Sequence, residues 1–176
     1  MGKIDLYIIP ECYADTNLVE YLIKSVCNHQ KGCANVAKKM QEKYQNGFAI
    51  GIIDFDKKKV PYVDEFNVVA ENDNLSVLRH RSRSHFIIFI KPAIEVFLMD
   101  SANQIGCKMS DFGFPDTLEG LKELTKKDTA NDSIELRNLY KCLKDSDNLK
   151  KLRGVIQYLC EARFGVDDER VREIVG

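Results

Sequence analysis

The chain has 176 residues, of which 44% are hydrophobic and 30% are charged. This length suits one globular domain with a buried core, and the supply of aliphatic and aromatic residues excludes an intrinsically disordered chain. The 26 basic and 27 acidic residues give a net charge of -1. Binding to nucleic acid through overall charge is therefore excluded, and any such role needs a local basic patch.

Neither the apolar runs nor the cysteines indicate a membrane or an oxidising compartment. The longest apolar runs, at residues 4–10 and 86–90, are strand-sized and far below the ~20 residues that cross a bilayer. The six cysteines contain no C-x-x-C pair, and Cys27, His29 and Cys33 lack the fourth ligand of a closed zinc site. We therefore expect a cytoplasmic protein with reduced thiols, no membrane partner and no signal peptide.

Strand-length apolar runs alternate with helix-spaced apolar positions along the chain. Buried strands are expected at residues 4–10, 48–53 and 86–90, with shorter strand candidates at 66–70 and 76–78. Helices are expected from apolar spacing and capping residues at 18–26, 36–44, 92–100, 118–124, 134–143, 149–164 and 167–175. This order predicts an α/β fold built on a parallel sheet with helices on both faces. The three buried strands would be neighbours in this sheet, and residues 66–78 would lie at its periphery.

Acidic residues follow each of the three expected strands. Glu11 follows the first strand and Asp15 comes four residues later; Asp54 and Asp56 follow the second; Glu95 lies in the first turn of the helix after the third. In parallel sheets functional residues gather at the carboxyl ends of strands. Carboxylates two residues apart on a strand point the same way and suit Mg²⁺ or Mn²⁺. The alternative is that each acid only caps a turn or a helix.

Three segments together resemble the Toprim family of topoisomerases, bacterial primases and phage-defence nucleases. They are residues 11–18 (ECYADTNL), 51–56 (GIIDFD) and 91–98 (KPAIEVFL), the last resembling the RloB-like and related defence-associated Toprim proteins. The resemblance covers residues 1–105. It implies a three-layer, Rossmann-like Toprim domain over residues 1–110 with a helical extension, 111–176, packed on the same domain.

The resemblance also implies roles for the acids. Glu11 would be the general acid or base, Asp54 and Asp56 would hold Mg²⁺ or Mn²⁺, and Asp15 and Glu95 would be supporting or second-metal ligands. Many Toprim domains have glycine directly after the glutamate, where this chain has Cys12. A side chain at that position would crowd a bound phosphate. The cysteine therefore weakens the expectation of polynucleotide cleavage more than the expectation of a metal site.

Two basic segments are candidates for contacting substrate phosphate. Lys57 and Lys58 directly follow the aspartate pair, and Arg79, Arg81 and Arg83 precede the third strand. Arginine pairs well with phosphate through its planar fork. The arginine loop starts at the end of the strand opposite the acids, so it would have to fold back over the site. The alternative for both segments is a solvated surface.

The residues thus favour a Mg²⁺-dependent phosphoryl-transfer enzyme, a nuclease in phage defence or nucleic-acid processing. The alternative is a non-catalytic Toprim-like module that recruits a partner protein. The sequence leaves open whether the substrate is DNA, RNA or a nucleotide, and whether the chain forms a homodimer. Phosphate-binding P-loop and dinucleotide-binding glycine motifs are missing from the sequence, so neither ATP hydrolysis nor dinucleotide binding is indicated.

Overall fold

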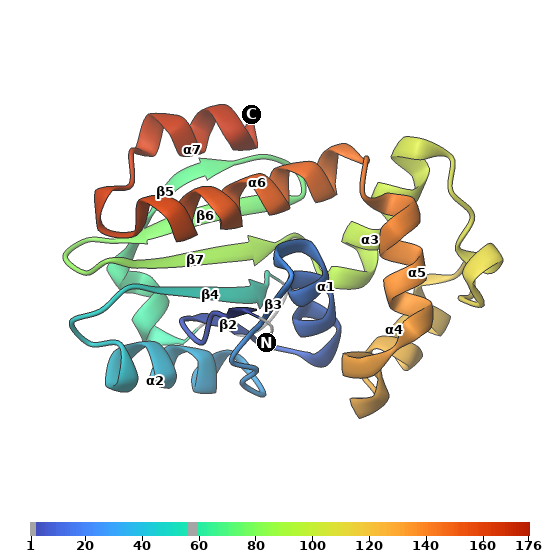
Figure 1. Ribbon diagram of the computed structural model, residues 1–176, viewed down its shortest axis with the longest axis horizontal. Helices are drawn as coiled ribbons and strands as arrows, with labels where there is room; N and C mark the ends of the chain where they lie inside the picture. The colour runs from blue at the N-terminus through green and yellow to red at the C-terminus, as the bar shows by residue number, and fades with distance from the viewer. Residues whose placement is uncertain (1–2, 56–59) are drawn as a thin grey trace.

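The computed structural model describes residues 3–55 and 60–176. Its centre is a mixed five-stranded sheet in the order β2-β4-β7-β6-β5, with helices packed around it (Figure 1). The strands are β2 (Ile8–Pro10), β4 (Ala49–Asp54), β5 (Phe66–Glu71), β6 (Leu75–His80) and β7 (His85–Ile90). The α-helices are α1 (Tyr13–Ile23), α2 (Cys33–Lys43), α3 (Ile94–Ile105), α4 (Leu118–Thr125), α5 (Ile134–Leu143), α6 (Asp147–Ala162) and α7 (Asp168–Val175). The α/β class expected from the sequence is confirmed.

The three strands expected from the apolar runs are parallel neighbours. In the register of the sheet, Ile52 of β4 lies between Pro10 of β2 and Ile88 of β7. Every residue of these three strands is buried, which is why they appear in the sequence as continuous apolar runs. The parallel arrangement brings the carboxyl ends of β2, β4 and β7 to the same edge of the sheet.

The other two strands correct the expectation of an entirely parallel sheet. β5 is antiparallel to β6, and β6 is antiparallel to β7. Both connections are short turns, which join only antiparallel neighbours. Asn72 holds the first turn, because its side-chain oxygen accepts hydrogen bonds from the backbone N–H groups of Asn74 and Leu75. Of the region expected at the periphery, β5 is the edge strand, but β6 is an internal strand between β7 and β5.

The first apolar run does not form one strand, contrary to the expectation for residues 4–10. Its start, β1 (Lys3–Ile4), pairs with β3 (Ser25–Val26) in a separate two-stranded sheet. Asp5 causes the interruption. Its carbonyl accepts a hydrogen bond from the N–H of Ile8 at 3.0 Å, and its buried carboxylate accepts one from the hydroxyl of Tyr7 at 2.8 Å.

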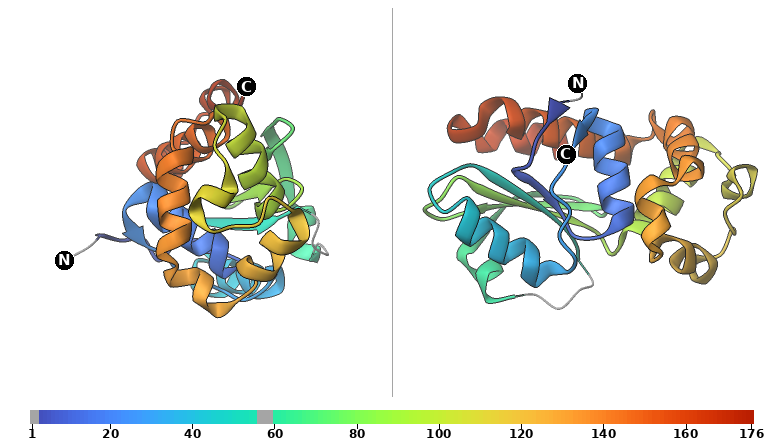
Figure 2. Two further views of the ribbon diagram at one scale, coloured as in Figure 1. Left: turned by 90° about the vertical axis from the view of Figure 1, so that its right-hand side faces the viewer. Right: turned by 60° about the horizontal axis from the view of Figure 1, so that its bottom comes forward.

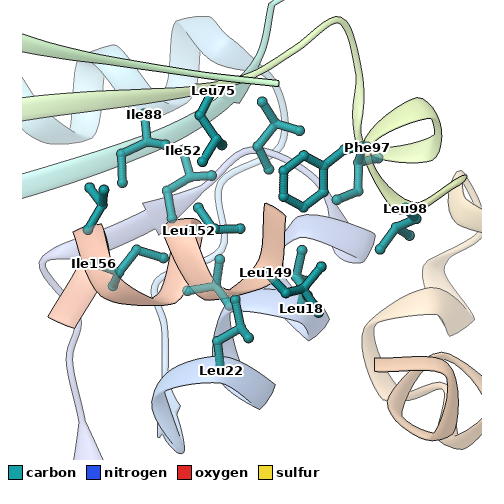
Figure 3. Close-up of a cluster of buried hydrophobic side chains, with 14 of the residues drawn as sticks. Leu18, Leu22, Ile52, Leu75, Ile88, Phe97, Leu98, Leu149, Leu152 and Ile156 are labelled. Carbon is teal, nitrogen blue, oxygen red and sulfur yellow. The ribbon is translucent and has the colours of Figure 1, made fainter. Parts of the chain in front are cut away.

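Two apolar clusters lie on opposite faces of the sheet. Val36 and Met40 of α2 belong to one, together with residues of the 3₁₀ turn Pro61–Glu65. The other joins α1, α3, α5, α6 and α7 to the opposite face. Figure 3 shows Leu152 and Ile156 of α6 packed toward Ile52 and Ile88 of the sheet. Figure 2 shows α2 and α6 on opposite sides of the strands.

The C-terminal helices continue this second cluster beyond the sheet. α3, α4 and α5 lie past the carboxyl ends of β4 and β7, and α6 returns along the face of the sheet toward α7 (Figure 1). α7 then contacts the edge strand, where the Arg172 guanidinium donates to the carbonyl of Val69. Among the described residues, no helix is both long and apolar enough to cross a bilayer.

Gly51 provides a test of the packing of α2 on β4. A Cβ at this position would lie 3.0 Å from both Met40 Sδ and Val36 Cγ1. Gly51→Val should therefore lower the free energy of unfolding by about 1–3 kcal/mol, measured by urea denaturation. Asn67→Val adds the same side chain at an exposed position of β5 and should change it by less than about 0.5 kcal/mol. Equal stability of the Gly51→Val variant and the wild type would contradict this packing.

Candidate functional site

Glu11 and Asp54 meet at the carboxyl edge of the parallel strands. Glu11 directly follows β2, and its N–H donates to the carbonyl of Ile52 at 3.0 Å. Asp54 ends β4, and its backbone N–H donates to Glu11 Oε2 at 3.2 Å. Both residues are nearly inaccessible, at 3% and 4% exposure. The strand-end argument therefore locates these two acids correctly.

The Asp54 carboxylate is tied to the beginning of α3. Its Oδ1 accepts a hydrogen bond from the backbone N–H of Ile94, the first residue of this helix, at 3.0 Å. The N-cap residue of α3 is Ala93, whose side chain cannot accept such a bond. Asp54 thus supplies the missing cap from another element and lies at the positive end of the helix dipole.

Glu95 connects the same turn of α3 to α4. It is buried, and its Oε1 accepts a short hydrogen bond from the hydroxyl of Thr125, the last residue of α4. Thr125 is also buried. This contact holds the end of α4 against the strand ends. Nothing in the sequence pattern pairs Thr125 with Glu95, because the two residues lie thirty positions apart on different helices.

Asp15 and Cys12 form the beginning of α1 beside these acids. Cys12 is the N-cap residue, and its Sγ accepts a hydrogen bond from the backbone N–H of Asp15 at 3.3 Å. Asp15 is fully buried. Burial raises the pKa of the Cys12 thiol far above its usual range, and the charges of Asp15 and Asp54 raise it further. The Cys12 side chain is therefore a neutral thiol that caps α1.

A small cavity opens beside the acids. It has a volume of about 130 Å³ and is lined by Cys12, Asp54, Ala93, Ile94, Glu95, Lys122, Thr125 and Lys126. Water occupies about 30 Å³ per molecule in the liquid, so the cavity has room for roughly four waters. Pockets for whole small molecules start at about 300 Å³. The cavity therefore suits a hydrated ion or one phosphoryl group rather than an entire nucleotide.

Lys122 and Lys126 are site residues that the sequence analysis missed. They lie four residues apart at the end of α4, so they share one side of the helix. Within the described parts of the chain, neither ammonium group has a carboxylate at ion-pair distance. Their spacing of four residues in the sequence indicated that they share one side of a helix. Only the packing of α4 onto α3 shows that this side lines the cavity beside Asp54.

The predicted arginines do not join the acids, because their loop stays at the opposite end of the strands. In the register of β4 and β7, His85 pairs with Ala49 and Ile90 pairs with Asp54. The turn before His85 is thus about 16 Å from the acids, at ~3.3 Å per residue. Arg79 donates to Asp168 and Val166, and Arg81 donates to the carbonyl of Asp64. Arg83 lines a separate cavity with Gln45, Asn46, Gly47, Ser82, Ser84 and Phe164.

The two histidines of the same segment have structural partners. Because a carbonyl only accepts, His85 Nε2 donates to Tyr44 O, and its Nδ1 accepts from the Tyr62 hydroxyl at 2.6 Å. His80 Nδ1 accepts from the backbone N–H groups of Ser82 and Arg83. Both rings are buried. They hold the β6–β7 turn and are far from the acids, so neither is a general base there.

Three of the predicted site residues fall outside the part of the chain that the structure describes. Asp56, Lys57 and Lys58 lie outside the described residues, so their predicted roles stay predictions. Within residues 3–55 and 60–176, no group of three or more His, Cys, Asp or Glu side chains is close enough to hold a metal ion. His29 instead stacks on Tyr13 with ring centroids 4.4 Å apart.

No family model, curated protein or solved structure significantly matches the chain. The resemblance of Glu11, Asp54 and Asp56 to the Toprim pattern therefore stays a prediction. The contact between Glu11 and Asp54 is independent of that resemblance, because it follows from the register of β2 and β4.

The cap that Asp54 gives to α3 can be tested by substitution in metal-free buffer. Asp54→Ala removes the acceptor of a buried N–H group and should lower the free energy of unfolding by about 1–3 kcal/mol. Asp54→Asn retains an acceptor oxygen and should therefore lower the free energy of unfolding by less than Asp54→Ala does. Asp73→Ala, at an exposed turn, is the control and should change stability by less than about 0.5 kcal/mol. A wild-type urea midpoint for Asp54→Ala would show that the cap contributes nothing.

Proposed function

We propose that this chain is a Mg²⁺- or Mn²⁺-dependent phosphoryl-transfer enzyme of Toprim type, acting as a nuclease in phage defence or nucleic-acid processing. In this proposal residues 1–110 form the three-layer Toprim-like domain and residues 111–176 its helical extension. The observation that carries the proposal is the contact between buried Glu11 and Asp54 at the strand ends. A small cavity lined by further acidic and basic side chains adjoins Asp54.

The donor set agrees with a magnesium site. Mg²⁺ in enzymes is usually held by one or two carboxylates, with waters and substrate oxygens as the remaining ligands. Asp54 supplies one such carboxylate within the described residues, with Glu11 beside it, and the proposal adds Asp56 from outside them. Each carboxylate has several lone pairs, so the hydrogen bonds from Asp54 N–H and Ile94 N–H are compatible with cation binding. When bound, the ion would polarise a phosphodiester and lower the pKa of a water molecule.

In this proposal the side chains around the site would transfer protons, orient the metal ligands and contact the phosphate. Glu11, directly after β2, would accept or donate the proton of the attacking or leaving oxygen. Asp54 is held in one orientation by the N–H of Ile94, which reduces the reorganisation needed on binding. Lys122 and Lys126 would contact the phosphate, in place of the distant arginines. Glu95 and Asp15 would act as supporting acids.

The size and charge of the cavity favour a polymer end or backbone as substrate over a free nucleotide. About 130 Å³ accommodates one phosphoryl group, so the rest of the substrate would lie outside on the surface. A free nucleotide would find no enclosing walls for its base. The size of the cavity therefore favours DNA or RNA over a nucleotide, and DNA and RNA fit it equally well.

A non-catalytic binding module is the second candidate. It is favoured by the hydrogen bonds that give the acids structural roles: Glu11 receives the Asp54 N–H, Asp54 caps α3 and Glu95 receives the Thr125 hydroxyl. Cys12 in place of glycine also favours it. In this alternative the acids would hold the helices in place while another surface recruits a partner protein.

A Mn²⁺ titration followed by thermal unfolding distinguishes the two candidates. At about 10–100 times its Kd, Mn²⁺ should stabilise the wild type by about 1.4–2.7 kcal/mol, which raises the Tm by several degrees. The same titration should leave the Tm of Asp54→Asn unchanged and should raise that of Asp73→Asn like the wild type. Cleavage of labelled DNA and RNA with Mg²⁺ or Mn²⁺ should fall at least about 100-fold in Glu11→Gln. A wild type that neither binds Mn²⁺ nor cleaves would contradict the enzymatic proposal.

Lys122 can be tested separately from the metal. Lys122→Ala should weaken binding of a single-stranded oligonucleotide about 5- to 10-fold and leave the Mn²⁺-dependent rise in Tm intact, because the lysine contacts phosphate and not the cation. Fluorescence anisotropy at fixed salt measures the binding. Lys108→Ala, which removes an exposed lysine outside this cavity, is the matched control. Equal losses in both variants would show that the lysines act only through net charge.

A further inference from the structure

Cys107 and Cys142 lie closer together than two nonbonded side chains pack. Their sulfur atoms are 2.7 Å apart. Nonbonded heavy atoms reach their best contact at roughly 3.5–4.0 Å, whereas the sulfurs of a disulfide are about 2.05 Å apart. The pair is therefore brought to a separation between contact and bonding. No sequence pattern pairs the two cysteines, because thirty-five positions separate them.

Secondary structure holds both residues in this relation. Cys107 follows the C-cap of α3, Gly106, whose φ of 68° allows the chain to reverse, and the Cys107 N–H donates to Ala102 O at 2.9 Å. Cys142 lies in the last turn of α5. The two helices pack in the same apolar cluster. The approach of the sulfurs thus follows from the packing of α3 on α5.

Both thiols are half-buried, so a small reagent can reach them. Burial raises the pKa of Cys107 to about 12, with smaller contributions from Cys142 and Asp111. Only a small fraction of Cys107 is thiolate at neutral pH, which makes exchange slow. Cys142 offers a second point of attack on the same pair.

We propose that Cys107 and Cys142 form a reversible intramolecular disulfide by exchange with a small disulfide such as oxidised glutathione. One cysteine thiolate attacks the glutathione disulfide, forming a mixed disulfide and releasing one glutathione thiolate. The second cysteine thiolate then attacks the mixed disulfide, forming the Cys107–Cys142 bond and releasing the second glutathione. The two cysteine sulfurs are oxidised, oxidised glutathione is reduced to two thiols, and the two cysteine protons end on those thiols.

The bond would fasten the end of α3 to α5. The first turn of α3 lines the cavity beside Asp54, so the cross-link would limit movement of one cavity wall. The disulfide itself does not depend on the proposed enzymatic function. Its formation can therefore be tested without an activity assay.

The test equilibrates the full chain with reduced and oxidised glutathione until the intact mass is constant, to allow for slow exchange. The wild type should lose about 2 Da, and protease digestion should yield one cross-linked peptide that contains Cys107 and Cys142. The bond links two residues that are thirty-five positions apart. Closing a loop of this length should raise the Tm by roughly 5–10 °C, and dithiothreitol should reverse the increase.

Three variants control the assignment. Cys107→Ser and Cys142→Ser should each abolish the cross-linked peptide and the rise in Tm, and should instead gain about 305 Da of glutathione at the remaining thiol. Cys33→Ser, which removes a half-buried thiol at the beginning of α2, should behave like the wild type. Independent glutathionylation of both cysteines in the wild type, a bond to another cysteine, or a bond that lowers the Tm would overturn the proposal.

Discussion

The geometry of the strand ends depends on Asp54. Its backbone N–H binds the carboxylate of Glu11, which joins β4 to the residue after β2, and its carboxylate binds the N–H of Ile94, which joins β4 to α3. Both acids are almost completely buried, so their carboxylates have lost most of their contact with water. The two hydrogen bonds offset the free energy that this loss of hydration costs. The direction in which α3 leaves the sheet then determines where Glu95 lies, and Glu95 in turn receives the hydroxyl of Thr125 from α4. One residue thus connects the sheet to the helices that form the cavity.

This arrangement places several carboxylates close to backbone N–H groups and helix N-termini, which stabilise negative charge. Glu11, Asp15, Asp54 and Glu95 come from four different segments and are all buried. Two of them benefit from helix N-termini: Asp15 lies in the first turn of α1, and Asp54 binds the first N–H of α3. Lys122 and Lys126, at the end of α4, line the same cavity as Asp54 and Glu95. A cation and a phosphate are the two kinds of group that such a mixture of side chains can accommodate together.

The sequence predicted the parts of the molecule that follow from local patterns. The apolar runs identified β4 and β7 because strands buried on both faces lack polar positions, and the strand-end rule correctly predicted that Glu11 and Asp54 meet. The direction of β5 and β6 was not predicted, although the Asn72 turn was a usable signal for a hairpin. The arginine loop was expected to start at the end of the sheet opposite the acids, and it does, but loop length alone could not show whether the loop reaches back to them. Thr125, Lys122 and Cys142 could not be found, since their contacts arise from helix packing between distant segments.

The most direct test of a metal site at Asp54 is a crystal soaked in Mn²⁺ and measured for anomalous scattering. We expect one strong anomalous peak between Glu11 and Asp54, at about 2.0–2.3 Å from a carboxylate oxygen of Asp54, the range of hard divalent cations. The same peak should be missing from crystals of Asp54→Asn. A wild-type crystal that diffracts well after soaking at saturating Mn²⁺, with no anomalous peak at these strand ends, would contradict the account.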